Sequence, residues 1–259
     1  MATDDERKQR EVLDKVMQEL QGLELEGMKP PDIADRVHYM VRKITGDSDP
    51  YKDLKDEFND RALFMYPDMK EKVEDSDDPL LTATKLAIAG NIIDFGPNSN
   101  FDLEGTVEDV LKSDLGIDHY DRFRKEVEDA EEIVYLADNS GEIVFDKLIL
   151  EELNDKKIIY VVKGGPILND AMLEDAEYVG IDKLAELDTV SNGLPNTGPR
   201  RDSKEFKGWM REKDMVISKG QGNYEVLSEA DLNIFFLLKA KCPVIAADLG
   251  VQVGDIVLD

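Results

Sequence analysis

The sequence predicts an α/β protein: a helical N-terminal domain, residues 1–105, followed by a Rossmann-like three-layer α/β/α domain with a mainly parallel sheet, residues 106–259. Two observations predict this fold class. The first hundred residues are highly charged and carry apolar residues at helical spacing. After about residue 105, short continuous apolar runs alternate with helical stretches, which is typical of parallel strands covered by helices on both faces.

Three helices are predicted in the N-terminal part. The first follows Pro30-Pro31, a pair that suits a helix start, and ends near Gly46; its apolar stripe consists of Ile33, Val37, Met40, Val41 and Ile44. The other two cover residues 53–66 and 80–93. The last has few charges, so we expect it to be buried.

The second part contains six apolar runs that are predicted strands, at residues 133–137, 158–162, 185–187, 215–218, 232–238 and 255–258. Helices are predicted at residues 141–153, 169–177 and 203–212. Ligands of open α/β sheets bind at the carboxyl ends of the strands. The loops that follow these runs are therefore the candidate functional loops.

Composition argues against several classes of protein. The chain has 58 acidic and 32 basic residues and a net charge of −26, which disfavours general nucleic-acid binding and docking on anionic lipid. With one cysteine, Cys242, and two histidines, it cannot build a disulfide, a cysteine-rich zinc site or an iron–sulfur site within one chain. Because no apolar run approaches ~20 residues and the N-terminus lacks signal-peptide features, we expect a soluble cytoplasmic protein that binds neither nucleic acid nor membranes.

Polar side chains follow two successive predicted strands. Asp138-Asn139-Ser140-Gly141 comes directly after the first strand, and Lys163-Gly164-Gly165 and then Asn169-Asp170 follow the second. Carboxylate and amide oxygens without histidine or thiolate suit a hard divalent cation such as Mg²⁺ or Mn²⁺. Each Asp/Asn pair would also serve as an ordinary helix cap. The residues alone leave both interpretations open.

Other groups at these strand ends are candidates for contact with a phosphate. The amides of Ser140 and Gly141 open a helix, where free N–H groups favour an anion. Lys163 and Lys219 each stand in a glycine-containing turn, where a lysine can pair with phosphate. The loop at residues 189–199, with Ser191 and Asn192, is either a ligand loop or a plain surface connection.

Three common motifs are missing from the sequence. No G-x-G-x-x-G follows the first strand, which disfavours a dinucleotide site. There is also no G-x-x-x-x-G-K-[ST] phosphate loop and no G-x-S-x-G nucleophile elbow.

Taken together, the motifs resemble those of the metal-dependent damage-control phosphatases, a family long called domain of unknown function 89. The resemblance rests on four stretches in the expected order within residues 80–259: Ala89-Gly90-Asn91-Ile92-Ile93-Asp94-Phe95-Gly96, Leu136-Ala137-Asp138-Asn139-Ser140-Gly141-Glu142, Val161-Val162-Lys163-Gly164-Gly165-Pro166-Ile167-Leu168-Asn169-Asp170-Ala171 and Ser218-Lys219-Gly220-Gln221-Gly222-Asn223. The first 75 residues match least. The cysteine pair common near the N-terminus of archaeal-type members is absent here.

The resemblance implies an enzyme that hydrolyses phosphomonoesters of small metabolites, such as sugar phosphates or related damaged metabolites. It also implies a divalent metal: Mg²⁺, Mn²⁺, Co²⁺ or Ni²⁺. The metal ligands of the family fall here on Asp138, Asn139 and Asp170. Further pocket residues of the family fall on Asn91, Asp94 and Lys219.

We therefore expect metal-assisted hydrolysis of a phosphomonoester. The candidate catalytic residues are Asp138, Asp94 and Lys219, the last neutralising charge on the transferring group. The residues expected to bind substrate are Asn91, Ser140, Gly141, Lys163, Ser191 and Asn192. The expected partner is a small phosphorylated metabolite, and the oligomeric state is left open. The alternatives are an S-adenosylmethionine-dependent carboxyl methyltransferase and a non-catalytic metabolite-binding protein.

Overall fold

The computed structural model describes residues 3–23, 30–90, 103–191 and 198–259. The N-terminal helices are α1 (Glu6–Gln21), α2 (Pro30–Thr45), α3 (Lys52–Glu74), α4 (Pro79–Gly90) and α5 (Leu103–Lys112). The strands are β1 (Ile117–Asp118), β2 (Glu132–Leu136), β3 (Lys157–Lys163), β4 (Glu186–Val190), β5 (Met215–Lys219), β6 (Ile234–Lys239) and β7 (Ile256–Leu258). The remaining helices are α6 (Tyr120–Asp129), α7 (Glu142–Glu152), α8 (Leu173–Val179), the short 3₁₀ helix η1 (Ile181–Lys183), α9 (Lys204–Arg211), α10 (Gln221–Leu227) and α11 (Pro243–Leu249).

Within these described ranges, seven strands form one sheet in the order β1-β7-β6-β5-β2-β3-β4. Neighbouring strands are parallel except for β6 and β7. In register, Leu136 of β2 lies between Val161 of β3 and Ser218 of β5. This arrangement confirms the predicted α/β fold with a mainly parallel sheet. It also brings the carboxyl ends of β2, β3 and β5 to one edge.

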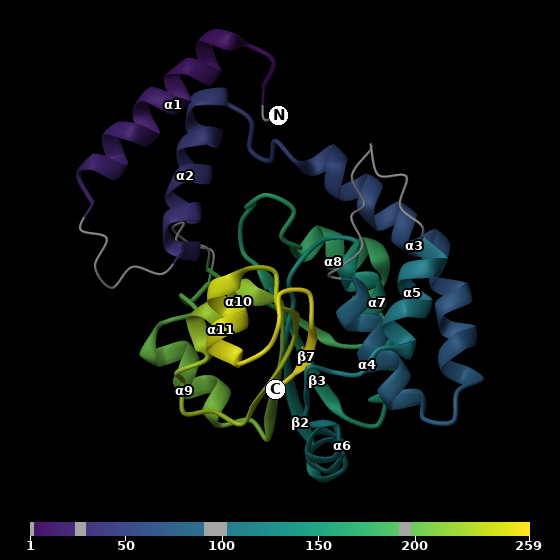
Figure 1. Ribbon diagram of the computed structural model, residues 1–259. Coiled ribbons are helices and arrows are strands. Elements are labelled where there is room, and N and C mark those ends of the chain that lie inside the picture. Colours follow the sequence, from purple (N-terminus) through teal and green to yellow (C-terminus); the bar gives the residue numbers. More distant parts are fainter. Residues whose placement is uncertain (1–2, 24–29, 91–102, 192–197) are drawn as a thin grey trace.

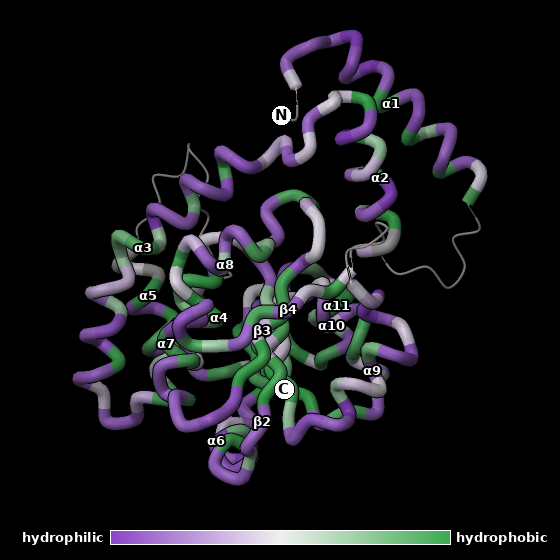
Figure 2. The backbone as a smooth tube through the Cα atoms, turned by 180° about the vertical axis from the view of Figure 1, so that it is seen from behind, coloured by the Kyte–Doolittle hydropathy of each residue, from purple (hydrophilic) through white to green (hydrophobic). Residues whose placement is uncertain are grey.

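Helices cover both faces of the sheet (Figure 1). On one face, Val134 and Leu136 pack with side chains of α9, α10 and α11, among them Phe206 and Leu227. On the other face, Ile133 and Tyr135 pack in the core formed by α3, α4 and α7. The edge strand β4 is partly exposed and carries Glu186 and Asp188. In β2, β3, β5 and β6, successive residues point to opposite faces that are both buried, so these strands are mostly apolar. Figure 2 shows these hydrophobic segments at the centre of the molecule.

Helices α3 and α4 share a hydrophobic core with α7 and the sheet. Phe58 of α3 and Leu86 of α4 belong to the same buried cluster as Phe145 of α7. The helices approach closely where α4 ends, because a Cβ atom on Gly90 would lie 3.1 Å from the Phe145 ring. The core is therefore continuous across the predicted domain boundary at residue 105, and the division of the chain into two domains there stays a prediction.

Several elements differ from the sequence prediction. Helix α3 continues to Glu74, through Pro67, beyond its predicted end at residue 66. Residues 169–172, predicted as the start of a helix, form a loop because their backbone pairs with the loop after β2 and with the end of β3, so α8 begins only at Leu173. Further elements that were not predicted are α1, α5, the two-residue strand β1, α6, η1 and α10. Residues 91–93 of the predicted helix 80–93 lie outside the described residues.

Helices α1 and α2 pack on each other at one end of the molecule (Figure 1). Helix α1 has no buried residues. Helix α2 reaches the edge where β3 ends, because the Arg42 guanidinium donates a hydrogen bond to the carbonyl oxygen of Pro166. Among the described helices, none combines the length and the apolar character needed to span a membrane.

Candidate active site

Backbone pairing brings the predicted metal ligands together. The loops after β2 and β3 run antiparallel at Asn139 and Asp170, which form an isolated bridge. The Ser140 amide donates to the Asn169 carbonyl at 2.8 Å, and the Ala171 amide donates to the Asp138 carbonyl at 2.9 Å. Asp138, Asn139 and Asp170 are therefore carried by directly adjoining backbone at the carboxyl edge of the sheet.

The Asp138 carboxylate lies in a negatively charged environment. Burial, together with the charges of Glu142 and Asp170, raises the pKa of Asp138 to about 7, while Lys163 and Lys241 act in the opposite direction. A nearby divalent cation would relieve this repulsion and favour the ionised form. The electrostatics at Asp138 thus fit a cation-binding position.

Asn139 is oriented by two carboxylates. Its side-chain nitrogen donates to Asp138 Oδ2 at 2.9 Å and to Glu142 Oε2 at 3.2 Å. The amide oxygen is then the atom that could bind a cation. In the described part of the chain, no three His, Cys, Asp or Glu side chains are arranged to hold a metal, so the candidate set is two carboxylates and this amide oxygen.

Gly220 makes room for the Asp138 side chain. It follows β5 with φ +78°, and a Cβ atom at this position would lie 1.9 Å from Asp138 Oδ2. Any side chain here would displace the carboxylate. The glycine after Lys219 therefore has a physical reason, which is close approach of the backbone to Asp138.

Lys219 is occupied by protein groups. Its side chain is fully buried, and Nζ lies 2.5 Å from Asp146 Oδ1, 2.7 Å from Glu142 Oε1 and 2.9 Å from the Ala87 carbonyl oxygen. Burial by itself would lower the pKa of Lys219, but the charges of Asp146 and Glu142 outweigh it and raise the pKa. Nζ donates hydrogen bonds to Asp146 and to the Ala87 carbonyl oxygen and is ion-paired with Glu142, so its charge is balanced within the protein. That Lys219 also neutralises charge on the transferring group stays a prediction.

Two tyrosines complete the surroundings of Lys219. Tyr135 donates to Asp146 Oδ1 at 2.8 Å, and Tyr160 donates to Asp146 Oδ2 at 2.7 Å. Their rings stack with centroids 5.1 Å apart. The sequence analysis missed this network, because both tyrosines lie within apolar strands and Asp146 lies within a helix.

Lys163 faces the candidate metal ligands. It is buried at the end of β3, with Nζ 3.8 Å from Asp170 Oδ2. Burial and the positive charge of Arg201 lower the pKa of Lys163, whereas Asp170 and Asp138 raise it. Of the two lysines predicted to contact phosphate, Lys163 is the one whose amino group lies beside a candidate metal ligand, Asp170.

Arg201 is a second cation at this edge, and the sequence analysis missed it. It is nearly buried and donates from Nη1 to Asn223 Oδ1 at 2.8 Å. Asn223 in turn donates to the carbonyl oxygens of Ala137 at 3.1 Å and Lys219 at 2.9 Å. This chain of hydrogen bonds ties Arg201 to the ends of β2 and β5. Its only sequence signal was a basic pair directly after the loop at residues 189–199.

The amides of Ser140 and Gly141 both have partners within the protein. Ser140 N donates to Asn169 O, and Gly141 N donates to Asn59 Oδ1 of α3 at 2.6 Å. These amides are therefore not available to bind phosphate, contrary to the sequence analysis. The buried Ser140 hydroxyl has no hydrogen-bond partner in the part of the chain that the structure describes.

Of the remaining predicted residues, Ser191 is the one that lies within the described ranges. Ser191 is buried directly after β4, and its amide donates to the Pro199 carbonyl oxygen at 2.7 Å. Asn91, Asp94 and Asn192 lie outside the described residues. Helix α2 also brings His38 near Asp170, and the sequence had not marked His38 as functional. Burial and the charge of Arg42 lower the pKa of His38, while the charge of Asp170 raises it.

Comparison with known proteins gives a consistent picture. The model of the damage-control phosphatase ARMT1-like domain matches residues 1–257. A protein of Methanocaldococcus jannaschii that is described as uncharacterised is 39% identical, with 99% of this chain and 88% of that protein covered. A damage-control phosphatase of Archaeoglobus fulgidus is 39% identical, with 87% of this chain and 80% of that protein covered.

A solved structure is similar along the whole chain. The crystal structure of a DUF89 family protein from Pyrococcus horikoshii aligns with a TM-score of 0.87 and 34% identity, covering 99% of this chain and 91% of that chain.

Proposed function

Because the chain belongs to the damage-control phosphatase ARMT1-like family, we propose that it is a metal-dependent phosphatase that hydrolyses phosphomonoesters of small metabolites. One observation carries the proposal: Asp138, Asn139 and Asp170 adjoin at the carboxyl edge of the sheet, beside a buried lysine. Sugar phosphates and related damaged metabolites are the proposed substrates.

The donor set fits a hard divalent cation. Asp138 and Asp170 offer carboxylate oxygens and Asn139 offers an amide oxygen, a combination that suits Mg²⁺, Mn²⁺, Co²⁺ or Ni²⁺. Burial first, and then the charges of Glu142 and Asp170, raise the pKa of Asp138, so a cation beside it would favour the ionised carboxylate. When bound there, a divalent cation would polarise a phosphoryl oxygen and lower the pKa of water.

The protein's own groups would bind and orient the phosphate. We assign charge neutralisation to Lys163 and Arg201, because phosphoryl transfer depends on positioned cations and Lys219 is bonded to carboxylates. The Ser140 hydroxyl would bond a phosphoryl oxygen. Glu142, held by Lys219, would keep the Asn139 amide in its orientation. On the family resemblance, Asp94 stays a proposed catalytic residue, and Asn91, Ser191 and Asn192 stay proposed substrate contacts.

A phosphatase assay on metal-stripped protein tests the proposal. Mg²⁺, Mn²⁺, Co²⁺ and Ni²⁺ are added in turn, with an aryl phosphate and a panel of sugar phosphates as substrates. We expect turnover that requires metal and that is lost in Asp138→Ala. The matched control is Asp155→Ala, at an exposed carboxylate before β3 and thus at the opposite edge of the sheet.

Two results would contradict the proposal. Equal turnover in Asp138→Ala and wild type would place the site elsewhere. No turnover with any of the four metals, from folded protein, would favour a non-catalytic metabolite-binding protein or the methyltransferase alternative.

A further inference from the structure

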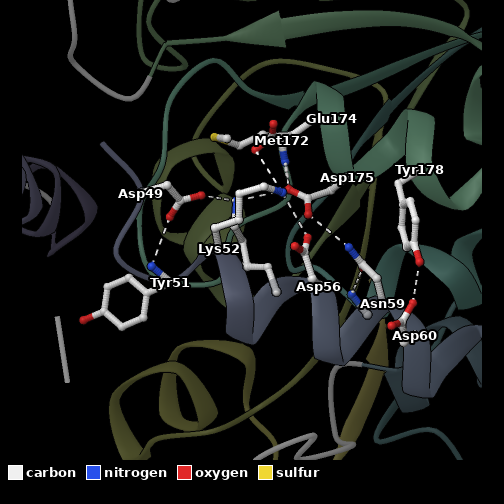
Figure 3. Close-up of polar contacts among 12 residues, drawn as sticks. Asp49, Tyr51, Lys52, Asp56, Asn59, Asp60, Met172, Glu174, Asp175 and Tyr178 are labelled. Carbon is white, nitrogen blue, oxygen red and sulfur yellow. Dashed lines mark hydrogen bonds and ion pairs between the residues drawn. The ribbon is translucent and has the colours of Figure 1, made fainter. Parts of the chain in front are cut away.

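A buried polar cluster lies outside the candidate metal ligands, between α3 and α8. It consists of Lys55 and Asn59 of α3 and Asp175 of α8, which are each at most 2% exposed. Figure 3 shows the Asn59 and Asp175 side chains pointing toward each other. In the sequence, Asp175 lies 120 positions after Lys55 and 116 positions after Asn59. No motif in the sequence marked them.

Asp175 fixes the backbone that follows Asp170. Its Oδ2 atom accepts a hydrogen bond from the Met172 amide at 2.9 Å and lies 3.2 Å from Lys55 Nζ. Its Oδ1 atom accepts a hydrogen bond from Asn59 Nδ2 at 3.0 Å. One carboxylate therefore ties the loop after β3, two residues past a proposed metal ligand, to helix α3.

Asn59 fixes the backbone that follows Asn139. While its nitrogen donates to Asp175, its oxygen accepts the Gly141 amide at 2.6 Å. Gly141 is two residues past Asn139, and its φ of +78° places it at the sharp turn into α7. The two ends of the Asn59 amide thus serve the two loops that carry Asp138, Asn139 and Asp170.

The cluster is a costly way to join two helices. Lys55 is fully buried between Asp49 Oδ2, at 2.7 Å, and Asp175 Oδ2. Burying ions carries a large desolvation penalty, and apolar residues of similar volume often replace a buried ion pair without loss of stability. Packing of α3 on α8 alone does not require these charges. Holding the loops after β2 and β3 in a fixed geometry gives the buried polar groups a role.

We infer that Asn59 and Asp175 are positioning residues for the metal site, holding the loops after β2 and β3 at a fixed separation from α3. The inference rests on the proposed function for the role of those loops. It makes α3, in the part of the chain whose sequence was least informative, a structural component of the active site. Neighbours that orient metal ligands typically change metal affinity or activity by about 10- to 100-fold when they are altered.

A reciprocal exchange tests the inference. In Asn59→Asp two carboxylates face each other, and in Asp175→Asn the Lys55 ammonium loses a counter-charge. The double variant Asn59→Asp/Asp175→Asn keeps the charge and restores the hydrogen bonds with donor and acceptor exchanged. Tyr178→Phe is the matched control, because the exposed Tyr178 hydroxyl joins α8 to Asp60 of α3 at the surface, 2.5 Å away (Figure 3).

Mn²⁺ affinity of the metal-stripped full chain is measured by calorimetry, below the unfolding temperature of each variant. We expect each single variant to bind Mn²⁺ about tenfold or more weakly, the double variant to recover most of the loss, and Tyr178→Phe to bind like wild type. Wild-type affinity in folded Asn59→Asp, or a double variant no better than the singles, would overturn the inference.

Hydrogen exchange separates this inference from the proposed function. We expect faster amide exchange over residues 138–143 and 170–173 in Asn59→Asp, and unchanged exchange there in Tyr178→Phe. Unchanged exchange in both variants would overturn the positioning role whatever the metal result. If wild type bound no metal and had no phosphatase activity, the proposed function would fail, while exchange would still decide whether Asn59 holds the loops. If Asn59→Asp does not fold, Asn59→Ser replaces it in both measurements.

Discussion

Lys163 and Lys219 are the last residues of β3 and β5, the two strands on either side of β2, and each is followed by glycine, yet their surroundings are opposite. Lys219 Nζ contacts two carboxylates and a carbonyl oxygen within 2.9 Å. Lys163 Nζ lies 3.8 Å from Asp170 Oδ2, and burial lowers its pKa. The first lysine therefore balances buried charge, and the second is placed for an anion.

This difference predicts opposite consequences of the same substitution. Lys219→Met leaves Asp146 and Glu142 without their cation, so we expect a loss of stability of about 3–5 kcal/mol. Lys163→Met removes a buried charge, so stability should change little, while turnover should fall about 100-fold because a transition-state donor is lost. Urea unfolding and phosphatase kinetics measure the two effects. A Lys219→Met protein as stable as wild type would contradict the assignment.

The raised pKa of Asp138 predicts how stability without metal depends on pH. Because the pKa is about 7 in the folded chain and about 3.9 in an unfolded one, the folded state holds a proton that the unfolded state has lost. The contribution of Asp138 to stability therefore falls as pH rises from about 4 to 7, by at most about 1.4 kcal/mol per pH unit.

Urea unfolding of metal-stripped protein across this pH window checks the prediction. Asp138→Asn should lose less stability than wild type as pH rises, and Asp155→Asn should follow wild type. Parallel profiles for Asp138→Asn and wild type would show that Asp138 titrates normally.

At the scale of elements, the site depends on how closely the end of β5 approaches the end of β2. Gly220 and Gly222 flank Gln221 but differ in environment. A Cβ atom on Gly220 would meet the Asp138 carboxylate at 1.9 Å, and its φ is +78°. At Gly222, within α10, nothing lies within 4 Å of an added Cβ atom.

These two glycines form a matched pair of tests. Gly220→Ala should cost about 1–3 kcal/mol for the backbone conformation alone, because φ +78° with ψ 162° is essentially restricted to glycine, and it should weaken metal binding by displacing Asp138. Gly222→Ala should leave metal binding unchanged and be neutral or stabilising by up to about 1 kcal/mol, since alanine favours a helix. Thermal unfolding and Mn²⁺ titration distinguish them. Equal metal affinity in the two variants would disprove the close-approach account.

Sequence patterns predicted the helices and strands better than they predicted which side chains contact one another. The apolar runs predicted the central strands because both faces of a parallel sheet are buried, and the adjacency of β2 and β3 brought Asp138, Asn139 and Asp170 together as expected. The partners of Lys219 could not be predicted, because nothing in the sequence distinguishes Glu142 and Asp146 from acidic residues on the exposed side of a helix. Asn59 and Asp175 meet only in the folded chain. The amides of Ser140 and Gly141 looked free because their partners, Asn169 and Asn59, are set by tertiary structure.

At the scale of the whole molecule, the helical part and the sheet share one core. Leu86 of α4 is fully buried in the cluster that includes α7 and the sheet. Trp209, the single tryptophan of the chain, lies on the opposite face, on α9. The fluorescence of Trp209 during unfolding therefore shows whether a destabilising substitution in the helical part also destabilises the opposite face of the sheet.

We expect Leu86→Ala to destabilise the molecule by about 2–5 kcal/mol and to shift the unfolding transitions at Trp209 and in far-UV circular dichroism together. The reason is the shared core, from which we expect the two parts to unfold as one unit. Two separate transitions, with Trp209 unaffected by the substitution, would instead show two independent folding units divided near residue 105.

Direct binding of Mn²⁺ to metal-stripped protein tests most directly whether Asp138, Asn139 and Asp170 hold a divalent cation. We expect stoichiometric binding in wild type and in Asp155→Ala, and loss of that binding in both Asp138→Ala and Asp170→Ala while the proteins stay folded. Undiminished Mn²⁺ binding in Asp138→Ala and Asp170→Ala, or none in wild type, would contradict this expectation.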